Sequence, residues 1–341
     1  MKAAAPTARE YVEGVLAGNR TLLARAVTLI ESQHPKHQQK AREVLRGVLP
    51  HTGKSWRVGI TGTPGAGKST LIEALGMFLI EQGHRVAVLA VDPSSSLTRG
   101  SILGDKTRME QLSRSPQAFI RPSPAGGTLG GVAQKSRETL MLCEAAGYDI
   151  VLVETVGVGQ SETHVRDMVD CFALLTLTGS GDELQGIKKG VMEMIDLLAV
   201  NKADGDNTSQ AAAGLRSLHM TLHYLNAFTP QWEIRSQLLS AFEPDMIAKF
   251  WQNVTDFFAH LEQHSLLQAR RATQREVWLR QLLETAVLQR FYEQDAVSAL
   301  YPRLLAQVKA GDVWAMDAVE TLLGVDRPVD RHVDREGFPG A

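Results

Sequence analysis

The sequence predicts an α/β fold with a mostly parallel central sheet flanked by helices, and with a helical extension at each end of the chain. Between Trp56 and about Phe242, short β-branched runs alternate with stretches of helical periodicity. This alternation is typical of a parallel sheet covered on both faces. A glycine-rich turn follows the first run directly, and the apolar residues on either side of the region recur at helical spacing. The pattern therefore separates one α/β domain from two helical regions.

Four regions follow from these patterns. Residues 1–54 form an N-terminal helical region, and residues 55–245 form the α/β domain. Residues 246–324 form a C-terminal helical region. In residues 325–341, prolines, charges and glycine replace the periodicity, so we expect this tail to be disordered.

Five runs are predicted strands, and a sixth is weaker. They are Val58–Thr61, Arg85–Val91, Asp149–Val153, Phe172–Thr178 and Leu197–Val200, followed by the weaker Ile234–Leu239. Each of the first five ends at a polar or glycine-bearing turn. In open α/β sheets these turns carry the chemistry. The residues just after the runs are therefore the candidates for binding and catalysis.

The C-terminal helical region has one amphipathic face, formed by Leu279, Leu282, Leu283, Ala286 and Val287. Such a stripe is most often core packing, but a helix that projects beyond the α/β domain could bury it against a second subunit. The periodicity alone does not choose between the two. We expect a possible dimerisation arm and a homodimer.

Composition limits the classes of function. With 341 residues and 44% hydrophobic residues, the chain can bury a sizeable core. Lysine and arginine are dispersed and the formal net charge is -2, so nucleic acid is not an expected partner. No apolar stretch is long enough to cross a bilayer, and the start of the chain lacks the pattern of a signal peptide. We therefore expect a cytoplasmic protein without membrane contact.

The strongest motif directly follows the strand Val58–Thr61 and precedes a helical run. It is a Walker A loop in the strand–loop–helix context that such a loop requires. Its glycines let successive N–H groups point at phosphate oxygens, next to the positive end of a helix. Lys68 would bridge the β- and γ-phosphates, and the hydroxyl of Ser69 would bind Mg²⁺. The predicted nucleotide-binding residues here are Gly62, Thr63, Pro64, Gly65, Ala66, Gly67, Lys68, Ser69 and Thr70.

Two acidic residues end predicted strands near this loop, as Mg²⁺ coordination requires. Asp92 follows Val91, and Glu154 begins an acid-x-x-Gly element, Glu154–Gly157, which is typical of a γ-phosphate sensor. Either acid alone could equally cap a turn. Small regulatory GTPases place a water-orienting glutamine just after this glycine, whereas this chain has Val158. Hydrolysis must therefore recruit another group or stay slow until a partner rearranges the site.

A base-recognition motif follows the strand Leu197–Val200. Asp204 can accept hydrogen bonds from both the ring N–H and the exocyclic amine of guanine, while the stem of Lys202 covers the base and Asn201 braces the loop. Adenine has no such donor pair, so an ATP complex would leave the carboxylate unpaired. Ser240 and Ala241 fit an auxiliary loop that contacts the guanine carbonyl. GTP and GDP are the expected nucleotides, and residues 55–245 are a predicted P-loop GTPase domain.

Together these motifs closely resemble one family, the MeaB/ArgK group of P-loop GTPases, formerly called LAO/AO transport system kinases. The resemblance covers roughly the chain up to Ala241 and, more loosely, the flanking helices. One departure is Arg99, where the family usually has glycine, which leaves the geometry of the first switch open. The matching segments are Gly62–Thr70, Val91–Ser95, Gly100–Met109, Phe119–Pro124, Glu154–Glu162 and Asp182–Gly190.

The resemblance implies more than the motifs do. Members of the family act as chaperones of adenosylcobalamin-dependent acyl-CoA mutases, so the implied partner is such a mutase, with methylmalonyl-CoA mutase the favoured client. It also implies that Asp105 joins Ser69, Asp92 and Glu154 around Mg²⁺ and that Gly179–Gly190 is a switch communicating with the mutase. Within that switch the implied catalytic groups are Lys188, Asp182 and Glu183, alongside Lys68 of the phosphate loop.

Two other functions remain open. A kinase of a transport system agrees with the old family name, but no separate acceptor-activating base is evident. A nickel-delivering GTPase would need cysteine or histidine clusters. The chain has only His34 and His37 as an approach to one, and we expect Cys143 and Cys171 to be buried free thiols.

Overall fold

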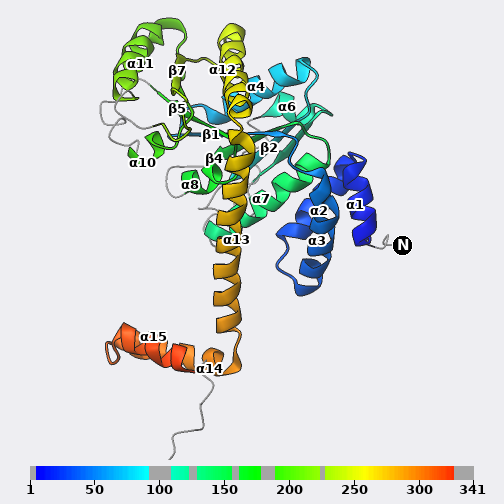
Figure 1. Cartoon of the computed structure of the whole chain (residues 1–341), viewed down its shortest axis with the longest axis vertical. Coiled ribbons are helices and arrows are strands. Elements are labelled where there is room, and N and C mark those ends of the chain that lie inside the picture. The colour runs from blue at the N-terminus through cyan, green and yellow to red at the C-terminus, as the bar shows by residue number, and fades with distance from the viewer. Residues whose placement is uncertain are drawn as a thin grey trace, which may run out of the picture. The chain divides into compact units, whose positions relative to one another are not determined.

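The computed structural model describes residues 5–91, 109–122, 129–155, 161–177, 189–222 and 227–325. In this part of the chain, seven strands form one sheet in the order β3-β2-β4-β1-β5-β6-β7, and every neighbouring pair is parallel (Figure 1). The strands are β1 Trp56–Gly62, β2 Val86–Val91, β3 Ala118–Arg121, β4 Ile150–Thr155, β5 Cys171–Thr176, β6 Leu197–Val200 and β7 Arg235–Leu238.

Four of the strands, β2, β4, β5 and β6, consist mostly of apolar residues and are buried along their whole length. Such continuous burial is typical of a parallel sheet with helices on both faces. Each predicted strand is found, with shifts at the ends, and Thr178 of the predicted Phe172–Thr178 lies outside the described residues. The edge strand β3 is not among the predicted strands, because only its first two residues are buried.

Helices cover both faces of the sheet. On one face α4 and α12 pack with strand residues into one apolar cluster. On the other face α7, α8 and α11 pack into a second cluster with the N-terminal helices. The helices that flank the sheet are α4 Lys68–Glu81, α6 Glu110–Arg114, α7 Leu129–Ala145, α8 Ser161–Arg166, α10 Lys189–Met192, α11 Thr208–Leu222 and α12 Pro244–Gln263, with the 3-10 turn η2 Gly205–Asn207.

The N-terminal region forms three helices, α1 Ala8–Leu16, α2 Arg20–Glu31 and α3 Pro35–Val48, and ends in the 3-10 turn η1 Leu49–His51. Side chains cap each helix: Thr7 forms a capping box with Glu10, and Asn19 accepts from the first turn of α2. His34 caps α3, whose first residue is a proline. The helices pack on α7, and their apolar faces belong to the core of the α/β domain.

The chain divides into two compact units, residues 1–274 and residues 275–341. Helix α12 belongs to the first unit, and its aromatic side chains are buried against the sheet; Phe258 stacks on Trp56 with ring centroids 4.2 Å apart. Helix α13 Leu266–Tyr292 begins in the first unit. The second unit contains the rest of α13 with α14 Asp295–Ala310 and α15 Ala315–Gly324.

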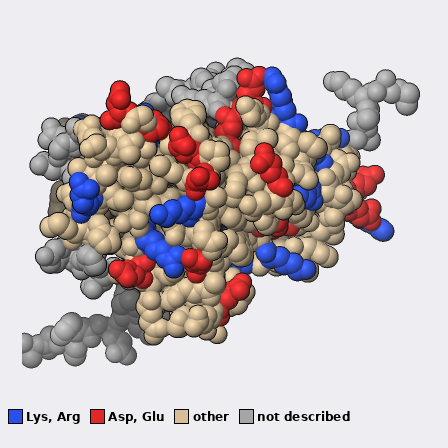
Figure 2. All heavy atoms as spheres, turned by 90° about the horizontal axis from the view of Figure 1, so that it is seen from above, with Lys and Arg blue, Asp and Glu red and all other residues tan. Residues whose placement is uncertain are grey.

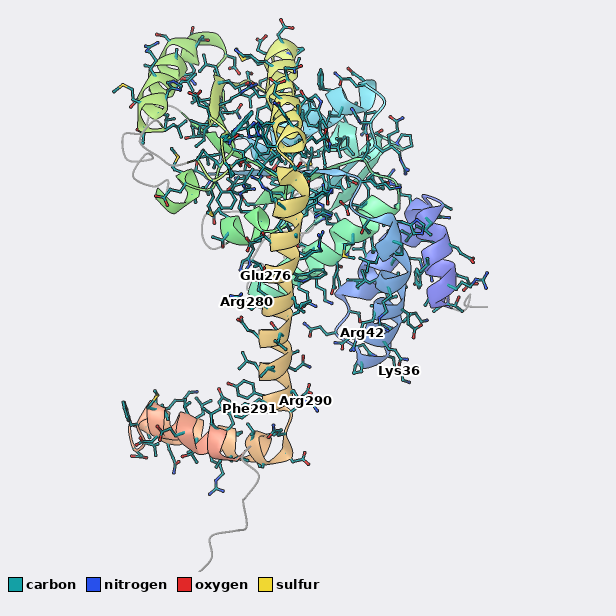
Figure 3. The ribbon with its side chains drawn as sticks, in the orientation of Figure 1. Lys36, Arg42, Glu276, Arg280, Arg290 and Phe291 are labelled. Atoms are coloured by element: carbon teal, nitrogen blue, oxygen red, sulfur yellow. The ribbon has the colours of Figure 1, made fainter. Side chains whose placement is uncertain are left out.

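The second unit has its own small core, and its surface carries both charged and apolar groups. The core consists of Val297, Leu304, Ala318 and Leu322. On α13, Glu276 and Arg280 lie one turn apart and form an ion pair of 3.6 Å (Figure 3). Basic and acidic side chains are likewise interspersed on the face of the molecule that Figure 2 shows.

Candidate nucleotide site

The loop between β1 and α4 has a backbone that only glycine tolerates at two positions. Gly62 has φ 152°, and a Cβ there would lie 2.1 Å from the carbonyl oxygen of Leu175 on β5. Gly67 has φ 88°, and its Cβ would lie 2.5 Å from Nδ2 of Asn201. Any side chain would therefore push the loop away from β5 and from the loop after β6. Glycine lets the loop sit close above the sheet, at the start of α4.

Lys68, the first residue of α4, folds back over this loop. Its Nζ donates to the carbonyl oxygens of Gly62 at 2.8 Å and Thr63 at 3.2 Å. The residue is buried, and burial lowers the pKa of its ammonium group, while the nearby carboxylates of Glu154 and Glu162 act in the opposite direction. A buried cation that donates to carbonyl groups on a turn is well placed to exchange them for anionic oxygens.

Ser69 and Glu154 meet at the centre of the site. The hydroxyl of Ser69 donates to Oε1 of Glu154 at 2.9 Å, although the two residues lie on α4 and at the end of β4. Beside them, the hydroxyl of Thr155 donates to Oγ1 of Thr61 at 2.9 Å, both buried, which ties the ends of β4 and β1 together. A carboxylate and a hydroxyl at this spacing are oxygen donors of the kind that Mg²⁺ takes. Two of the four predicted metal ligands therefore fit the ion.

The loop after β6 is joined to the phosphate loop by a direct hydrogen bond. Nδ2 of Asn201 donates to the carbonyl oxygen of Ala66 at 2.7 Å, and Asn201 is buried. The next residue, Lys202, is exposed and has the left-handed φ of 58°, which is uncommon for a residue with a side chain. The Asn201 bond fixes the two loops against each other, so residues predicted to bind phosphate and base belong to one site.

Asp204 is oriented by the loop that follows β7. Its Oδ2 accepts from the hydroxyl of the fully buried Ser240 at 2.5 Å, and the backbone N–H of Phe242 donates to the same hydroxyl at 3.1 Å. The backbone N–H of Ala203 in turn donates to the carbonyl oxygen of Leu239 at 3.0 Å. Because the Asp204 carboxylate is only partly buried, it keeps acceptor capacity for a ligand while its direction is fixed.

Several predicted functional residues lie outside the described part of the chain. They are the metal candidates Asp92 and Asp105 and the switch residues Asp182, Glu183 and Lys188, together with Val158. Among the residues that the structure does describe, no group of three or more His, Cys, Asp or Glu side chains is arranged to hold a metal ion. Cys143 and Cys171 are buried free thiols, as expected.

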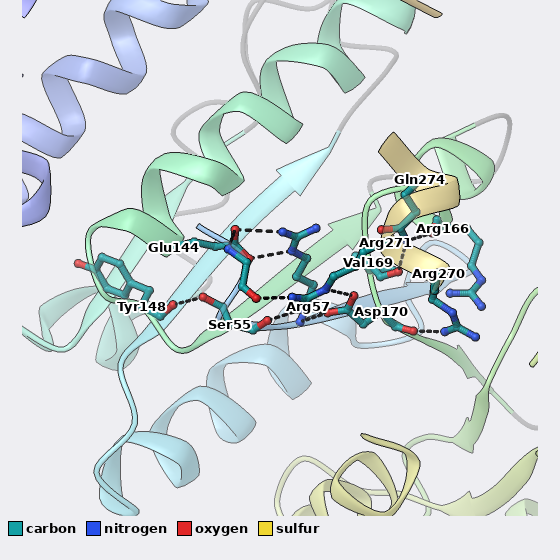
Figure 4. Close-up of polar contacts among 11 residues, drawn as sticks. Ser55, Arg57, Glu144, Tyr148, Arg166, Val169, Asp170, Arg270, Arg271 and Gln274 are labelled. Atoms are coloured by element: carbon teal, nitrogen blue, oxygen red, sulfur yellow. Dashed lines mark hydrogen bonds and ion pairs between the residues drawn. The ribbon is translucent and has the colours of Figure 1, made fainter. Parts of the chain in front are cut away.

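Sequence reasoning missed a buried network of charged residues at the N-terminal ends of the central strands β1 and β5, which Figure 4 shows. Arg271 binds Asp170 through Nε at 2.9 Å and Nη2 at 2.6 Å, and Arg57 binds Glu144 through Nε at 2.8 Å. The backbone N–H of Arg57 also donates to Asp170 at 3.1 Å. One sequence signal could have indicated this network: the acidic residue Asp170 stands immediately before the apolar run that begins at Cys171.

The parallel sheet, the glycine loop that leads into α4 and the paired base loops define a P-loop nucleotide-binding protein of the GTPase class. The chain belongs to the family described as methylmalonyl Co-A mutase-associated GTPase MeaB, whose sequence profile matches residues 23–296. The resemblance seen in the motifs is thereby confirmed. Because its relatives are named GTPases, the chain is a GTP hydrolase of this family.

Individual relatives agree with this assignment. The chain is 48% identical over 303 residues to the GTPase ArgK of Escherichia coli (strain K12), covering 89% of this chain and 92% of ArgK. It is 43% identical over 320 residues to the mitochondrial methylmalonic aciduria type A homolog of Mus musculus, covering 91% of this chain and 77% of that protein. A crystal structure of a LAO/AO transport system kinase is 40% identical, with a TM-score of 0.73, and covers 93% of this chain and 97% of that chain.

Within the described ranges, no helix combines the length and the apolar character needed to cross a bilayer.

Proposed function

We propose that this GTPase acts as a chaperone of an adenosylcobalamin-dependent acyl-CoA mutase, with methylmalonyl-CoA mutase as the client, and that GTP binding and hydrolysis gate cofactor loading and protect the mutase. The structural observation that carries the nucleotide part is the 2.7 Å hydrogen bond from Asn201 to Ala66. The client is supported by the names of the family and of its mouse relative, which refer to methylmalonyl-CoA mutase and to methylmalonic aciduria.

The phosphate end of the proposed site uses groups from three elements. Backbone N–H groups of the loop from Gly62 to Gly67, at the N-terminal end of α4, bind phosphate oxygens. Lys68, whose ammonium group lies within 3.2 Å of two loop carbonyls, turns to the β- and γ-phosphates. Mg²⁺, held by Ser69 and Glu154 and, by resemblance, by Asp92 and Asp105, would neutralise phosphate charge. Thr70 completes the predicted set on α4.

The base end selects guanine. The carboxylate of Asp204, oriented by Ser240, accepts from the two neighbouring donors of guanine, and Lys202 covers the ring. Ala241 supplies a backbone N–H to the guanine carbonyl. An adenine nucleotide leaves Asp204 facing an acceptor ring nitrogen and a C–H group, so we expect GDP to bind at least tenfold more tightly than ADP, a difference of about 1.4 kcal/mol or more.

Hydrolysis requires a group that orients the attacking water, and none of the phosphate-site residues described above supplies it. A valine at position 158 has no polar group that orients water, so we propose slow turnover by the isolated protein. In this proposal the mutase orders the switch Gly179–Gly190. Lys188, or its neighbours Asp182 and Glu183, then meets the developing charge or the attacking water. The effect of such a contact belongs to the transition state, and therefore to turnover rather than to affinity.

We also propose that the second unit forms a homodimer. The apolar face predicted on α13 is largely exposed in the single chain: Leu279 is 67% exposed and Leu283 is 60% exposed. Further exposed apolar side chains of this unit are Val287, Leu288, Trp314, Met316, Val319 and Leu323. Four of these side chains, Val287, Leu288, Val319 and Leu323, line one pocket, and exposed apolar surface that is gathered in this way marks protein interaction sites. Burial against a second copy would remove this surface from water.

A kinase acting on a transport system is the second candidate, because a solved relative carries the name LAO/AO transport system kinase. Transfer of the γ-phosphate of labelled GTP to an arginine-binding protein, rather than to water, would favour it. The chaperone proposal predicts inorganic phosphate as the only labelled product.

Two measurements test the proposal together. Isothermal titration of the wild-type protein with GDP and ADP in Mg²⁺ tests base selection, and equal affinities would contradict it. Size-exclusion chromatography with purified methylmalonyl-CoA mutase and a non-hydrolysable GTP analogue tests the client. Co-elution is expected. Separate elution in both the GDP and the GTP-analogue states would contradict the assignment of this mutase.

A further inference from the structure

The part of helix α13 that belongs to the first unit, up to Gln274, has buried polar side chains. In the described chain, the two residues of this helix that are buried are Arg271 and Gln274. Arg271 binds the fully buried carboxylate of Asp170 through two nitrogens and donates to the carbonyl oxygen of Ser55 at 2.6 Å. Gln274 donates through Nε2 to the carbonyl oxygen of Val169 at 2.7 Å. The helix therefore holds the corner at residues 169–170 through directional bonds, which specify position more than they add stability.

This corner follows directly after α8. Helix α8 ends at Arg166, and its C-terminal carbonyl groups are bound by side chains of other elements: Nε2 of Gln274 lies 3.5 Å from the Arg166 carbonyl oxygen, and Arg137 donates to that of Asp167. In the sequence, α8 begins just after the Glu154–Gly157 element that is predicted to sense the γ-phosphate. A displacement of that element would therefore act on α8 and on its bonds to α13.

Arg166 and Gln274 each carry a buried polar group without a partner. Nε and Nη1 of Arg166 have no hydrogen-bond acceptor among the described residues, and Oε1 of Gln274 has no donor there. Arg166 is 4% exposed and Gln274 is 9% exposed. An unsatisfied buried donor or acceptor destabilises the state that contains it. Here the unpaired groups are donors on one residue and an acceptor on the other, and the two residues are neighbours (Figure 4).

Among the described residues, the ion pair of Arg166 with Asp196 is long, at 3.4 Å to both carboxylate oxygens. The carboxylate of Asp196 already accepts from the backbone N–H of Phe172 at 2.9 Å and from the hydroxyl of Thr229 at 2.5 Å. The guanidinium lies over the ring of Phe228 at 4.2 Å, a contact that tolerates sliding because it is not directional. The amide of Gln274, by contrast, is fixed by its bond to Val169.

We propose that Arg166 and Gln274 form a two-position latch that responds to the γ-phosphate. In the position described here, Arg166 stays on Asp196 and Phe228. In the second position, α8 shifts toward α13, and the guanidinium of Arg166 donates to Oε1 of Gln274 while Gln274 keeps its bond to Val169. This inference rests on the proposed nucleotide site, since occupation of that site by GTP selects the second position and GDP selects the first.

Substitutions at Gln274 give opposite predictions, which separates the latch from a general structural role. Gln274→Leu removes the acceptor, so the dissociation constant of a non-hydrolysable GTP analogue should rise about five- to tenfold relative to that of GDP. Gln274→Glu loses the bond to Val169 in both positions but gives Arg166 a charged acceptor in the second. The same ratio should therefore fall. Arg275→Ala, the exposed neighbour on α13, is the matched control and should leave the ratio unchanged.

The experiment uses calorimetric titration of the full-length protein with both nucleotides in Mg²⁺, with thermal unfolding monitored for each variant. If Gln274→Leu does not fold, Arg166→Lys takes its place and should raise the ratio in the same direction. Equal ratios in all variants, or a shift of the same sign for Gln274→Leu and Gln274→Glu, would overturn the latch. A wild-type protein that fails to bind either guanine nucleotide would instead overturn the proposed function on which the latch rests.

Discussion

The hydroxyl of Ser69 lies 2.9 Å from Oε1 of Glu154, although the residues are 85 positions apart in the chain. One stands in the first turn of α4 and the other at the end of β4, next to the strand that leads into the glycine loop. The contact links the loop predicted to bind phosphate to the element predicted to sense the γ-phosphate. We expect Mg²⁺ to draw on both oxygens, and this expectation leads to the first prediction.

Glu154→Gln should lower Mg²⁺-dependent GTP turnover by at least tenfold while the fold persists. An amide keeps the shape and can still accept from Ser69, but it removes the negative charge that attracts the cation. Steady-state phosphate release at increasing Mg²⁺ measures the effect. Glu81→Gln, an exposed acid at the far end of α4, is the control. Unchanged Mg²⁺ dependence in Glu154→Gln would remove Glu154 from the metal site.

Lys68→Ala should abolish tight GTP binding or hydrolysis. The substitution deletes the cation predicted to bridge the β- and γ-phosphates, and hydrogen bonds to charged groups each contribute about 1.5–3 kcal/mol. It also relieves a buried charge held by loop carbonyls, so the free energy of unfolding without nucleotide should not fall sharply. Calorimetry with GTP and denaturant unfolding measure the two quantities. Hydrolysis at the wild-type rate would show that the phosphate site has been misplaced.

Asp204→Asn should weaken the preference for guanine over adenine about ten- to a hundredfold. The carboxylate offers acceptors to both guanine donors, whereas an amide offers one acceptor and one mismatched donor. The ratio of the GDP and ADP dissociation constants measures the preference. Asp206→Asn, on the exposed turn η2 two residues later, should leave that ratio as it is. A preserved preference in Asp204→Asn would contradict its role in base recognition.

Gly62→Ala should destabilise the protein more than Gly83→Ala. Both residues have positive φ values, which cost a residue with a side chain about 1–2 kcal/mol. At Gly83 an added Cβ meets nothing within 4 Å, whereas at Gly62 it lies 2.1 Å from the carbonyl oxygen of Leu175. The added clash forces β1 and β5 apart. Chemical denaturation measures both variants, and equal losses would contradict the described close approach.

Much of the fold and of the nucleotide site was predictable because local signals and sheet geometry agree. The loop from Gly62 to Lys68 specifies its own strand and helix, and parallel strands bring their C-terminal ends to one edge. The resulting nearness of Ser69 to Glu154 therefore follows from topology. The sequence indicated only that Asn201 braces a loop. The structure adds its partner, the carbonyl oxygen of Ala66 in the phosphate loop.

The buried network could not be predicted for a physical reason. Arg271 and Asp170 are separated by 101 positions, and nothing in the periodicity of α13 indicates which of its arginines is buried. Arg271 is buried and Arg275, one turn later, is exposed. Amphipathic patterns report apolar faces, so a helix that docks through an arginine and a glutamine gives no comparable signal. The short edge strand β3 was not predicted for a related reason: only half of it is buried, so its apolar pattern is weak.

We propose that a mutase controls hydrolysis by this GTPase, and single-turnover GTP hydrolysis with and without saturating methylmalonyl-CoA mutase tests this control most directly. Because Val158 cannot orient water, the isolated protein should turn over well below a typical enzyme rate of about 10 s⁻¹. The mutase should accelerate hydrolysis, and Lys188→Ala should lose most of that acceleration while keeping basal hydrolysis and nucleotide affinity. Full acceleration of Lys188→Ala would reject the role proposed for this lysine. An unchanged wild-type rate in the presence of the mutase would contradict control of hydrolysis by the mutase.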